Sequence, residues 1–167
     1  MIEETDLLLE FLPEAGIKLG VAFLCGILLG MERELKGKPA GLRTITLITV
    51  GSTLFMVVSE LATVTTGGPE AITRVDPSRI ASQVVSGIGF LGAGAIIESR
   101  GSVHGLTTAA TIWVAAGIGL CIGVGFPALA GGITLLVLTV LVALHPLRTW
   151  LNRRGDTSPP GPRDAER

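Results

Sequence analysis

The chain has 167 residues, of which 48% are hydrophobic and 16% charged, and its formal net charge is −1. A soluble domain carries about a quarter charged residues, so the composition argues against an ordinary soluble fold. The near-neutral charge argues against a nucleic-acid partner, since no basic stripe is available to neutralise phosphates.

The charges fall in short clusters, and between them lie nearly charge-free stretches of about 17 to 20 residues, the length that a helix needs to cross a bilayer. Five membrane-spanning helices are predicted in this way, at 14–31, 44–62, 79–97, 106–124 and 127–146. The N-terminus is acidic, the reverse of a signal peptide, so we expect the first span to be retained.

Basic residues concentrate in the loops after the first, third and fifth spans, which predicts an N-terminus outside and a C-terminus inside the cell. The expected fold is therefore an all-α, polytopic five-helix transmembrane bundle. Its parts are an acidic N-terminal segment 1–13, a membrane domain 14–147 and a disordered, basic, proline-rich cytoplasmic tail 148–167.

Ionisable residues occur near the outer ends of the first three spans. Lys18 stands a turn inside the first span, and Glu60 has the equivalent place in the second. We expect Lys18 to extend its ammonium to the membrane surface, as long basic side chains do near helix ends. Asp76 and Pro77 form a helix-start signal before the third span, although Asp76 beside Arg79 could also receive a cation.

Residues 87–96 read GIGFLGAGAI, an apolar run with four glycines. The part from Gly87 to Gly92 satisfies the G-x-G-x-x-G pattern of dinucleotide sites. That site needs a preceding strand and an acidic residue about 20 positions further on, and neither is present, so the match is accidental. In a membrane helix, glycines instead allow a second helix to approach closely.

Small residues recur at helical spacing on three of the spans, which predicts seams of close backbone packing. We therefore expect Gly89→Leu to force the helices apart. The expected packing residues are Gly26 and Gly30 in the first span, Ser82, Ser86, Gly87, Gly89, Gly92, Ala93 and Gly94 in the third, and Thr111, Ala115, Gly119 and Gly123 in the fourth.

Polar side chains are also expected to point into the bundle. Arg79, Gln83 and Ser86 share one face of the third span and would form a polar stripe descending from the outer surface. Thr107 and Thr108 place hydroxyls at the inner end of the fourth span, where they could also cap the helix or bond back to carbonyls.

Three charged residues flank the first inward loop. Glu32 and Arg33 close the first span, and Arg43 opens the second. Neighbouring residues on a helix diverge by about 100°, so Glu32 and Arg33 are not expected to pair, and one of them is expected to face the bundle. The alternative for all three is a role as interfacial anchors.

An enzyme is not expected, because no arrangement of nucleophile and base is apparent. Magnesium prefers carboxylate or carbonyl oxygens and several retained waters, and the candidates Glu32, Asp76 and Glu98 are scattered along the sequence. We therefore predict no cofactor, leave a metal site unknown, and allow Mg²⁺ as a ligand or substrate.

Three segments together resemble the MgtC/SapB family of bacterial inner-membrane proteins: GMERELKGKPAGLRT (30–44), DPSRIASQVVSGIGFLGAGAII (76–97) and GLTTAATIWVAAGIGLCIG (105–123). The resemblance covers about residues 15–145. It implies a multi-pass, five-span bundle in the inner membrane with a cytoplasmic C-terminus. The best-known member of that family is a virulence factor associated with growth at low magnesium, survival in macrophages and restraint of the F-type ATP synthase.

The resemblance also implies functional roles for a set of polar positions. The virulence-associated members carry an asparagine at the position of Thr107 and append a soluble C-terminal domain, so this chain looks like the short, membrane-only branch. Both departures weigh against virulence and ATP-synthase control here. The implied positions are Glu32, Arg33, Arg43, Asp76, Arg79, Gln83, Thr107, Thr108 and Trp113, the last expected to serve in packing.

Two functions remain open from the sequence. The favoured one is a non-enzymatic regulatory or accessory protein of the bilayer, linked to magnesium homeostasis. It would dock its glycine-rich faces against itself, as a homo-oligomer with a dimer favoured, or against a membrane-protein partner. The alternative is a small Mg²⁺ transporter or channel with a polar path along the third span, although five spans without an internal repeat do not suggest alternating access within one chain.

Overall fold

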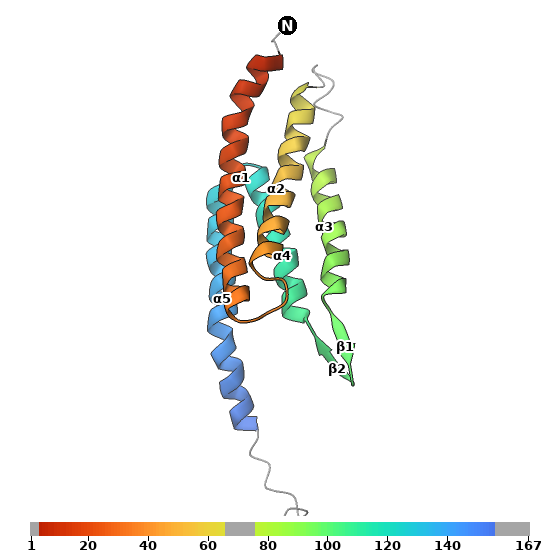
Figure 1. Cartoon of the computed structure of the whole chain (residues 1–167), viewed down its shortest axis with the longest axis vertical. Coiled ribbons are helices and arrows are strands. Elements are labelled where there is room, and N and C mark those ends of the chain that lie inside the picture. Colours follow the sequence, from red (N-terminus) through yellow and green to blue (C-terminus); the bar gives the residue numbers. More distant parts are fainter. Residues whose placement is uncertain (1–3, 66–75, 156–167) are drawn as a thin grey trace, which may run out of the picture.

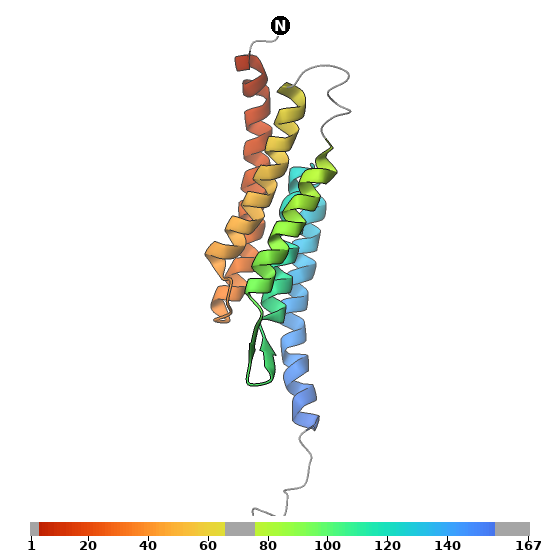
Figure 2. The ribbon, with the colours of Figure 1, turned by 90° about the vertical axis from the view of Figure 1, so that its right-hand side faces the viewer.

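A computed structural model describes residues 4–65 and 76–155. The described chain forms an elongated bundle of helices that run along one long axis, with a short hairpin beside the start of α4 (Figures 1 and 2). The elements in chain order are α1 Glu4–Leu35, α2 Leu42–Thr65, α3 Pro77–Gly94, β1 Ile97–Ser99, β2 Ser102–His104, α4 Leu106–Gly123 and α5 Pro127–Gly155.

Four of the described helices are long and apolar enough to cross a membrane, which confirms an α-helical membrane protein. They are Phe11–Leu35, Leu42–Ala62, Leu106–Gly123 and Pro127–Leu144. Helix α3 is not in this set; its 18 residues include an arginine, a glutamine and three serines. The third predicted span is therefore a helix, but its length and composition do not by themselves qualify it as one that crosses the bilayer.

The ends of the predicted elements need correction. Helix α1 begins at Glu4 and continues through Pro13, so most of the predicted acidic segment is helical. Helix α5 continues to Gly155, so residues 148–155, which we assigned to a disordered tail, are helical as well. The remainder of that tail, 156–167, lies outside the described residues.

The third predicted span, 79–97, stops at Gly94 and is followed by an antiparallel hairpin in which Ile97 pairs with His104. The hairpin turn is made by Arg100 and Gly101, with φ of 51° and 74°. Positive φ at both central residues is the geometry of a tight two-residue hairpin turn. The strands have three residues each, too few to produce a recognisable alternation in the sequence.

Helix α2 packs between α1 and α4, and glycines set both distances. A methyl group on Gly26 or Gly30 of α1 would lie 2.7 Å from the Cα of Thr46 or Leu42 on α2. On α4, a methyl group on Gly119 would lie 2.9 Å from Ser52 Cβ. Because side chains are missing at these points, backbones meet directly, as in close-packed membrane helices.

The predicted seam on α4 is buried, and it adjoins the apolar core. Thr111, Ala115, Gly119 and Gly123 all lie in the interior of the chain. The core cluster draws on α1, α2, α4 and α5, and consists of Ala22, Cys25, Leu29, Ile45, Ile112, Ala115, Ile118, Ile122 and Ala130. Two of the three predicted seams, those on α1 and α4, therefore lie at the centre of the bundle.

The seam predicted on α3 is wrong for the single chain. Ser82, Ser86, Gly89 and Ala93 are exposed. A methyl group added at Gly87, Gly89 or Gly94 would meet nothing within 4 Å. Gly92 is buried, and a methyl group there would lie 3.8 Å from Ala109 of α4, so it is the one predicted packing residue of α3 that faces the bundle. Helix α3 attaches through other faces, so Gly89→Leu is not expected to break this fold.

Candidate functional site

A buried arginine joins the end of α1 to the start of α4. Arg33 is 3% exposed, and its Nη2 donates a hydrogen bond of 2.9 Å to Thr108 Oγ1. Its Nε has no hydrogen-bond partner among the described residues. Buried charges require partners, so this guanidinium depends on the Thr108 hydroxyl, a residue 75 positions away in the sequence.

Glu32, next to Arg33, is also buried but pairs elsewhere. Its Oε1 lies 2.6 Å from Lys36 Nζ, one turn further along α1, and the Glu32 side chain is 8% exposed. Lys36 Nζ also donates to the carbonyl of Leu141 on α5, at 3.1 Å. Glu32 and Arg33 therefore diverge, as expected. We expected one of the two side chains to face the bundle, and the structure shows that both contact other parts of the protein.

We call the group of Glu32, Arg33, Lys36 and Thr108 the inner ionic cluster. It joins α1, α4 and α5 at the end of the bundle that also carries the hairpin (Figure 1). With one carboxylate against two cations, the cluster is a poor cation site. Within the described part of the chain, no group of three or more His, Cys, Asp or Glu residues is placed to hold a metal ion.

A second ionic group lies toward the other end of α1. Lys18 is 7% exposed, and its Nζ lies 2.7 Å from Glu60 on α2 and 3.0 Å from Glu14 on α1. Glu60 and Glu14 are themselves 44% and 64% exposed, and the extension of Lys18 to the membrane surface stays a prediction. An ion pair neutralises the ammonium inside the bundle, about 22 Å along α1 from Arg33 at 1.5 Å per residue.

Sequence reasoning missed a row of hydroxyls on the buried face of α2. Thr49 and Thr53 are fully buried, and Thr53 Oγ1 donates to the carbonyls of Thr49 and Gly119, at 3.0 and 2.8 Å. The bond to Gly119 crosses from α2 to α4 where the two backbones are closest. The signal was present as Thr46, Thr49 and Thr53 at spacings of three and four within an apolar span.

Asp76 caps α3. Its Oδ1 accepts a hydrogen bond of 2.9 Å from the backbone N–H of Ser78, and Pro77 occupies the first turn. Hydrogen bonds from Ser78, together with the nearby charge of Arg79, hold the pKa of the Asp76 carboxyl below its ordinary value. The capping interpretation is confirmed.

The polar stripe of α3 does not point into the bundle. Arg79, Gln83 and Ser86 are exposed, because the face of α3 that meets α4 is a different one. Of the three, Gln83 lines an open space between α2 and α3, while Arg79 and Ser86 do not, so the stripe forms no buried polar path through the described single chain.

The remaining candidates lie apart from the inner ionic cluster. Thr107 is exposed, and its carbonyl accepts from Thr111 Oγ1 at 2.7 Å. Trp113 is 55% exposed, so the packing role expected for it is not made within this chain. Arg43 is exposed in the first turn of α2. Of the nine implied positions, the structure brings together Glu32, Arg33 and Thr108.

Apolar helices joined by glycine seams, with ionic groups buried between them, define a polytopic α-helical membrane protein. The sequence comparison identifies it further: residues 19–150 match the model of the MgtC family. The chain belongs to this family.

Curated relatives support the assignment. The chain is 48% identical over 126 residues to the "Putative magnesium transporter YhiD" of Escherichia coli K12, covering 75% of this chain and 58% of that protein. It is 46% identical over 115 residues to "Protein SapB" of Bacillus subtilis, covering 68% and 49%. It is 42% identical over 142 residues to "Protein MgtC" of Brucella abortus, covering 83% and 56%.

The chain therefore spans about half the length of these relatives. No solved structure matches the chain.

Proposed function

We propose that this protein is a non-enzymatic regulatory or accessory protein of the bacterial inner membrane, linked to adaptation to magnesium supply. It acts through helix contacts made by the exposed face of α3, with a second copy of the chain as the favoured partner. The magnesium link rests on family membership and on the printed name of the Escherichia coli relative.

The observation that carries the proposal is the outward face of α3, which we call the small-residue face. It consists of Ser82, Ser86, Gly89 and Ala93, all exposed and spaced four, three and four residues apart. Serine hydroxyls and the small surfaces of glycine and alanine make few favourable contacts with lipid chains. They favour close approach of another helix, since small residues and serines are what interfaces between membrane helices contain.

The orientation proposed is N-out and C-in. The end of the bundle formed by the α1–α2 loop and the hairpin carries Lys36, Lys38, Arg43 and Arg100. The opposite end, where α3 begins, carries Arg79 next to Asp76. An excess of basic residues in short loops marks the cytoplasmic side, which supports this orientation, with α3 as a further helix that crosses the membrane.

Oligomer formation in lipid tests the proposal. Two labelled populations of the full chain are reconstituted in liposomes, and energy transfer between them is measured as the protein is diluted with lipid. Wild type is expected to give transfer that falls on dilution as a dimer dissociates. Gly89→Leu is expected to abolish it while the helical circular dichroism remains.

Gly132→Leu is the matched control. Gly132 lies on α5, is exposed and has open space at its Cβ, like Gly89, so the same substitution tests the face rather than the added bulk. Transfer retained in Gly89→Leu, or lost equally in both variants, would contradict the small-residue face. A strain that lacks the protein is grown at limiting Mg²⁺. We expect the wild-type chain to restore growth and Gly89→Leu not to restore it, which would connect the helix contact to function.

The second candidate is a small Mg²⁺ transporter or channel, favoured by the name of the Escherichia coli relative and by the buried charges of Glu32 and Lys18. The exposed position of Arg79 and Gln83 weighs against the path first expected. Uptake of Mg²⁺ into proteoliposomes, followed with an entrapped indicator dye, decides between the two. We expect no flux above empty liposomes. Flux that disappears in Glu32→Gln would replace the regulatory proposal.

A further inference from the structure

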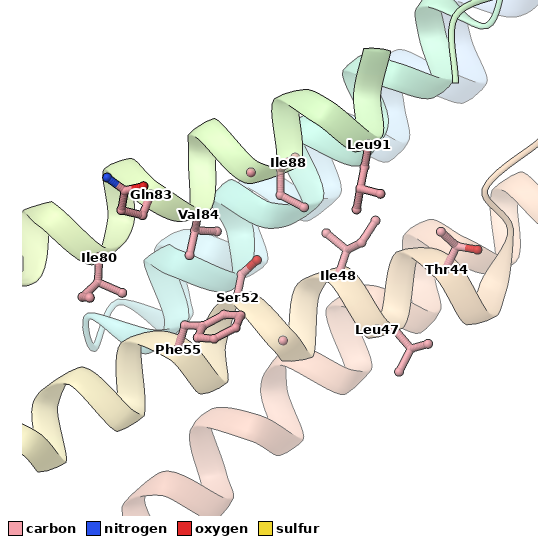
Figure 3. A pocket seen from close by; sticks show the side chains of 12 residues that line it. Thr44, Leu47, Ile48, Ser52, Phe55, Ile80, Gln83, Val84, Ile88 and Leu91 are labelled. Carbon is pink, nitrogen blue, oxygen red and sulfur yellow. The ribbon is translucent and has the colours of Figure 1, made fainter. Parts of the chain in front are cut away.

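An apolar groove runs between α2 and α3, on the side of α3 away from the small-residue face (Figure 3). Its volume is 690 Å³. In Figure 3, Ile80, Val84, Ile88 and Leu91 of α3 face across it toward Ile48 and Phe55 of α2. Ser82 lies about 200° around α3 from Ile80, so the groove and the proposed dimer contact use opposite faces.

The groove is open and elongated. It extends from Thr44 to Phe55 on α2 and from Ile80 to Leu91 on α3. The eleven helical steps between the first and last of these residues correspond to about 16 Å, which is half of the hydrocarbon core of a bilayer, about 30 Å. Gly51 and Gly87 contribute to its walls, and a methyl group on either would meet nothing within 4 Å. The groove therefore has the reach of one lipid leaflet.

One end of the groove lies beside an unpaired cation. Arg43 is exposed and directly precedes Thr44, which lines the groove. It stands four residues before Leu47, another lining residue, so Arg43 and Leu47 share a side of α2. Arg43 makes no ion pair with the described residues. The nearby carboxylate of Glu34 instead accepts from the Leu42 N–H, at 3.0 Å.

The positive charge of Arg43 is unfavourable at the N-terminal end of α2. Arg43 lies in the first turn of α2, where no acidic residue is present. The N-terminal end of a helix carries partial positive charge, so it attracts anions and repels cations. The first amide of the helix, that of Leu42, is already bonded to the Glu34 carboxylate. An external anion beside Arg43 would pair with the guanidinium itself, which has no ion-pair partner among the described residues.

We propose that the groove binds an anionic phospholipid, with one acyl chain between α2 and α3 and the headgroup phosphate at Arg43. The charge at this end and the apolar walls match the two parts of such a molecule. With the orientation proposed above, the headgroup is in the cytoplasmic leaflet, whose anionic lipids attract basic residues next to membrane spans. The inference does not depend on dimer formation.

Native mass spectrometry of the full chain, released from nanodiscs that contain equal amounts of phosphatidylglycerol and phosphatidylcholine, tests the headgroup. We expect wild type to retain phosphatidylglycerol about fivefold more, the value of one basic residue near an anionic surface. Arg43→Gln is expected to reduce the ratio to about one, and Arg43→Lys to preserve it. Lys38→Gln, an exposed residue of the same end, is the control and should not change it.

The position of the acyl chain is tested by photolabelling, first in the wild-type protein and then in two variants. A phosphatidylglycerol with a photoreactive acyl chain should label peptides of α2 and α3 that line the groove. Gly87→Phe, which fills it, should remove this labelling, while Gly132→Phe on α5 should not. An unchanged lipid ratio in Arg43→Gln, or labelling spread evenly over all helices, would overturn the proposal. So would efficient disulfide formation between two copies of Gly51→Cys, since a second chain would then occupy the groove.

Discussion

The glycine seam between α2 and α4 gives a sharp test of the packing. Gly119→Ala adds one methyl group to α4 at a point where it would lie 2.9 Å from Ser52 Cβ and 3.1 Å from the carbonyl carbon of Thr49. Carbon atoms pack best at about 3.5–4.0 Å. The two backbones must therefore separate by about 0.6 Å or more, because a backbone atom cannot rotate away as a side chain can.

Gly117→Ala is the matched control, two residues away on the same helix. Gly117 is exposed, and a methyl group there would meet nothing within 4 Å. Both substitutions gain about 1 kcal/mol of helix propensity. At Gly119 this gain is opposed by an overpacking cost of about 1–3 kcal/mol, and the separation also weakens the Thr53 hydrogen bond to the Gly119 carbonyl.

We therefore expect Gly119→Ala to be less stable than Gly117→Ala by about 1–3 kcal/mol. The measurement is unfolding of the purified protein in mixed micelles by increasing fractions of denaturing detergent, followed by circular dichroism. Larger residues at position 119 should increase the difference. Equal unfolding curves for the two alanine variants would refute direct backbone contact between α2 and α4.

Three further outcomes follow from the ionic contacts, each measured by the same unfolding assay. Thr108→Val should cost about 1–3 kcal/mol, since it leaves the Arg33 guanidinium buried without its acceptor, whereas Thr108→Ser should be nearly neutral; equal losses would contradict the role of the hydroxyl. Lys18→Met should stay within about 1 kcal/mol of wild type, because the two carboxylates that lose this partner, Glu14 and Glu60, are 64% and 44% exposed and are hydrated, and ion pairs with exposed groups contribute little; a large loss would show that the ion pair itself stabilises the fold. The Asp76 cap should contribute at neutral pH and be lost as pH falls through its depressed folded pKa, and Asp76→Asn should remove this acid dependence; an unchanged dependence would exclude the cap as its source.

The apolar spans and several local features could be predicted from the sequence, because they depend on neighbouring residues. The Asp76 cap needs only Asp76, Pro77 and Ser78. The seam on α4 follows from a spacing of four that is repeated along one helix. The divergence of Glu32 and Arg33 follows from the helix period alone.

Long-range partners were decided by the tertiary structure. Lys18 pairs with Glu60 across 42 positions, and Arg33 bonds to Thr108 across 75. A helix period states which residues share a face, but it does not state which helix that face will meet. For this reason the same reasoning succeeded on α4, whose ridge of small residues meets α2, and failed on α3, whose similar ridge points outward.

The sequence by itself thus determined a membrane-embedded helical protein of the MgtC family, since hydropathy and motif spacing are local properties of the chain. The tertiary structure decided which polar residues are buried, which glycines bring backbones together, and where an open apolar groove ends beside Arg43. Each of these depends on the relative rotation of two packed helices, and the hydrophobic pattern of either helix leaves that rotation undetermined.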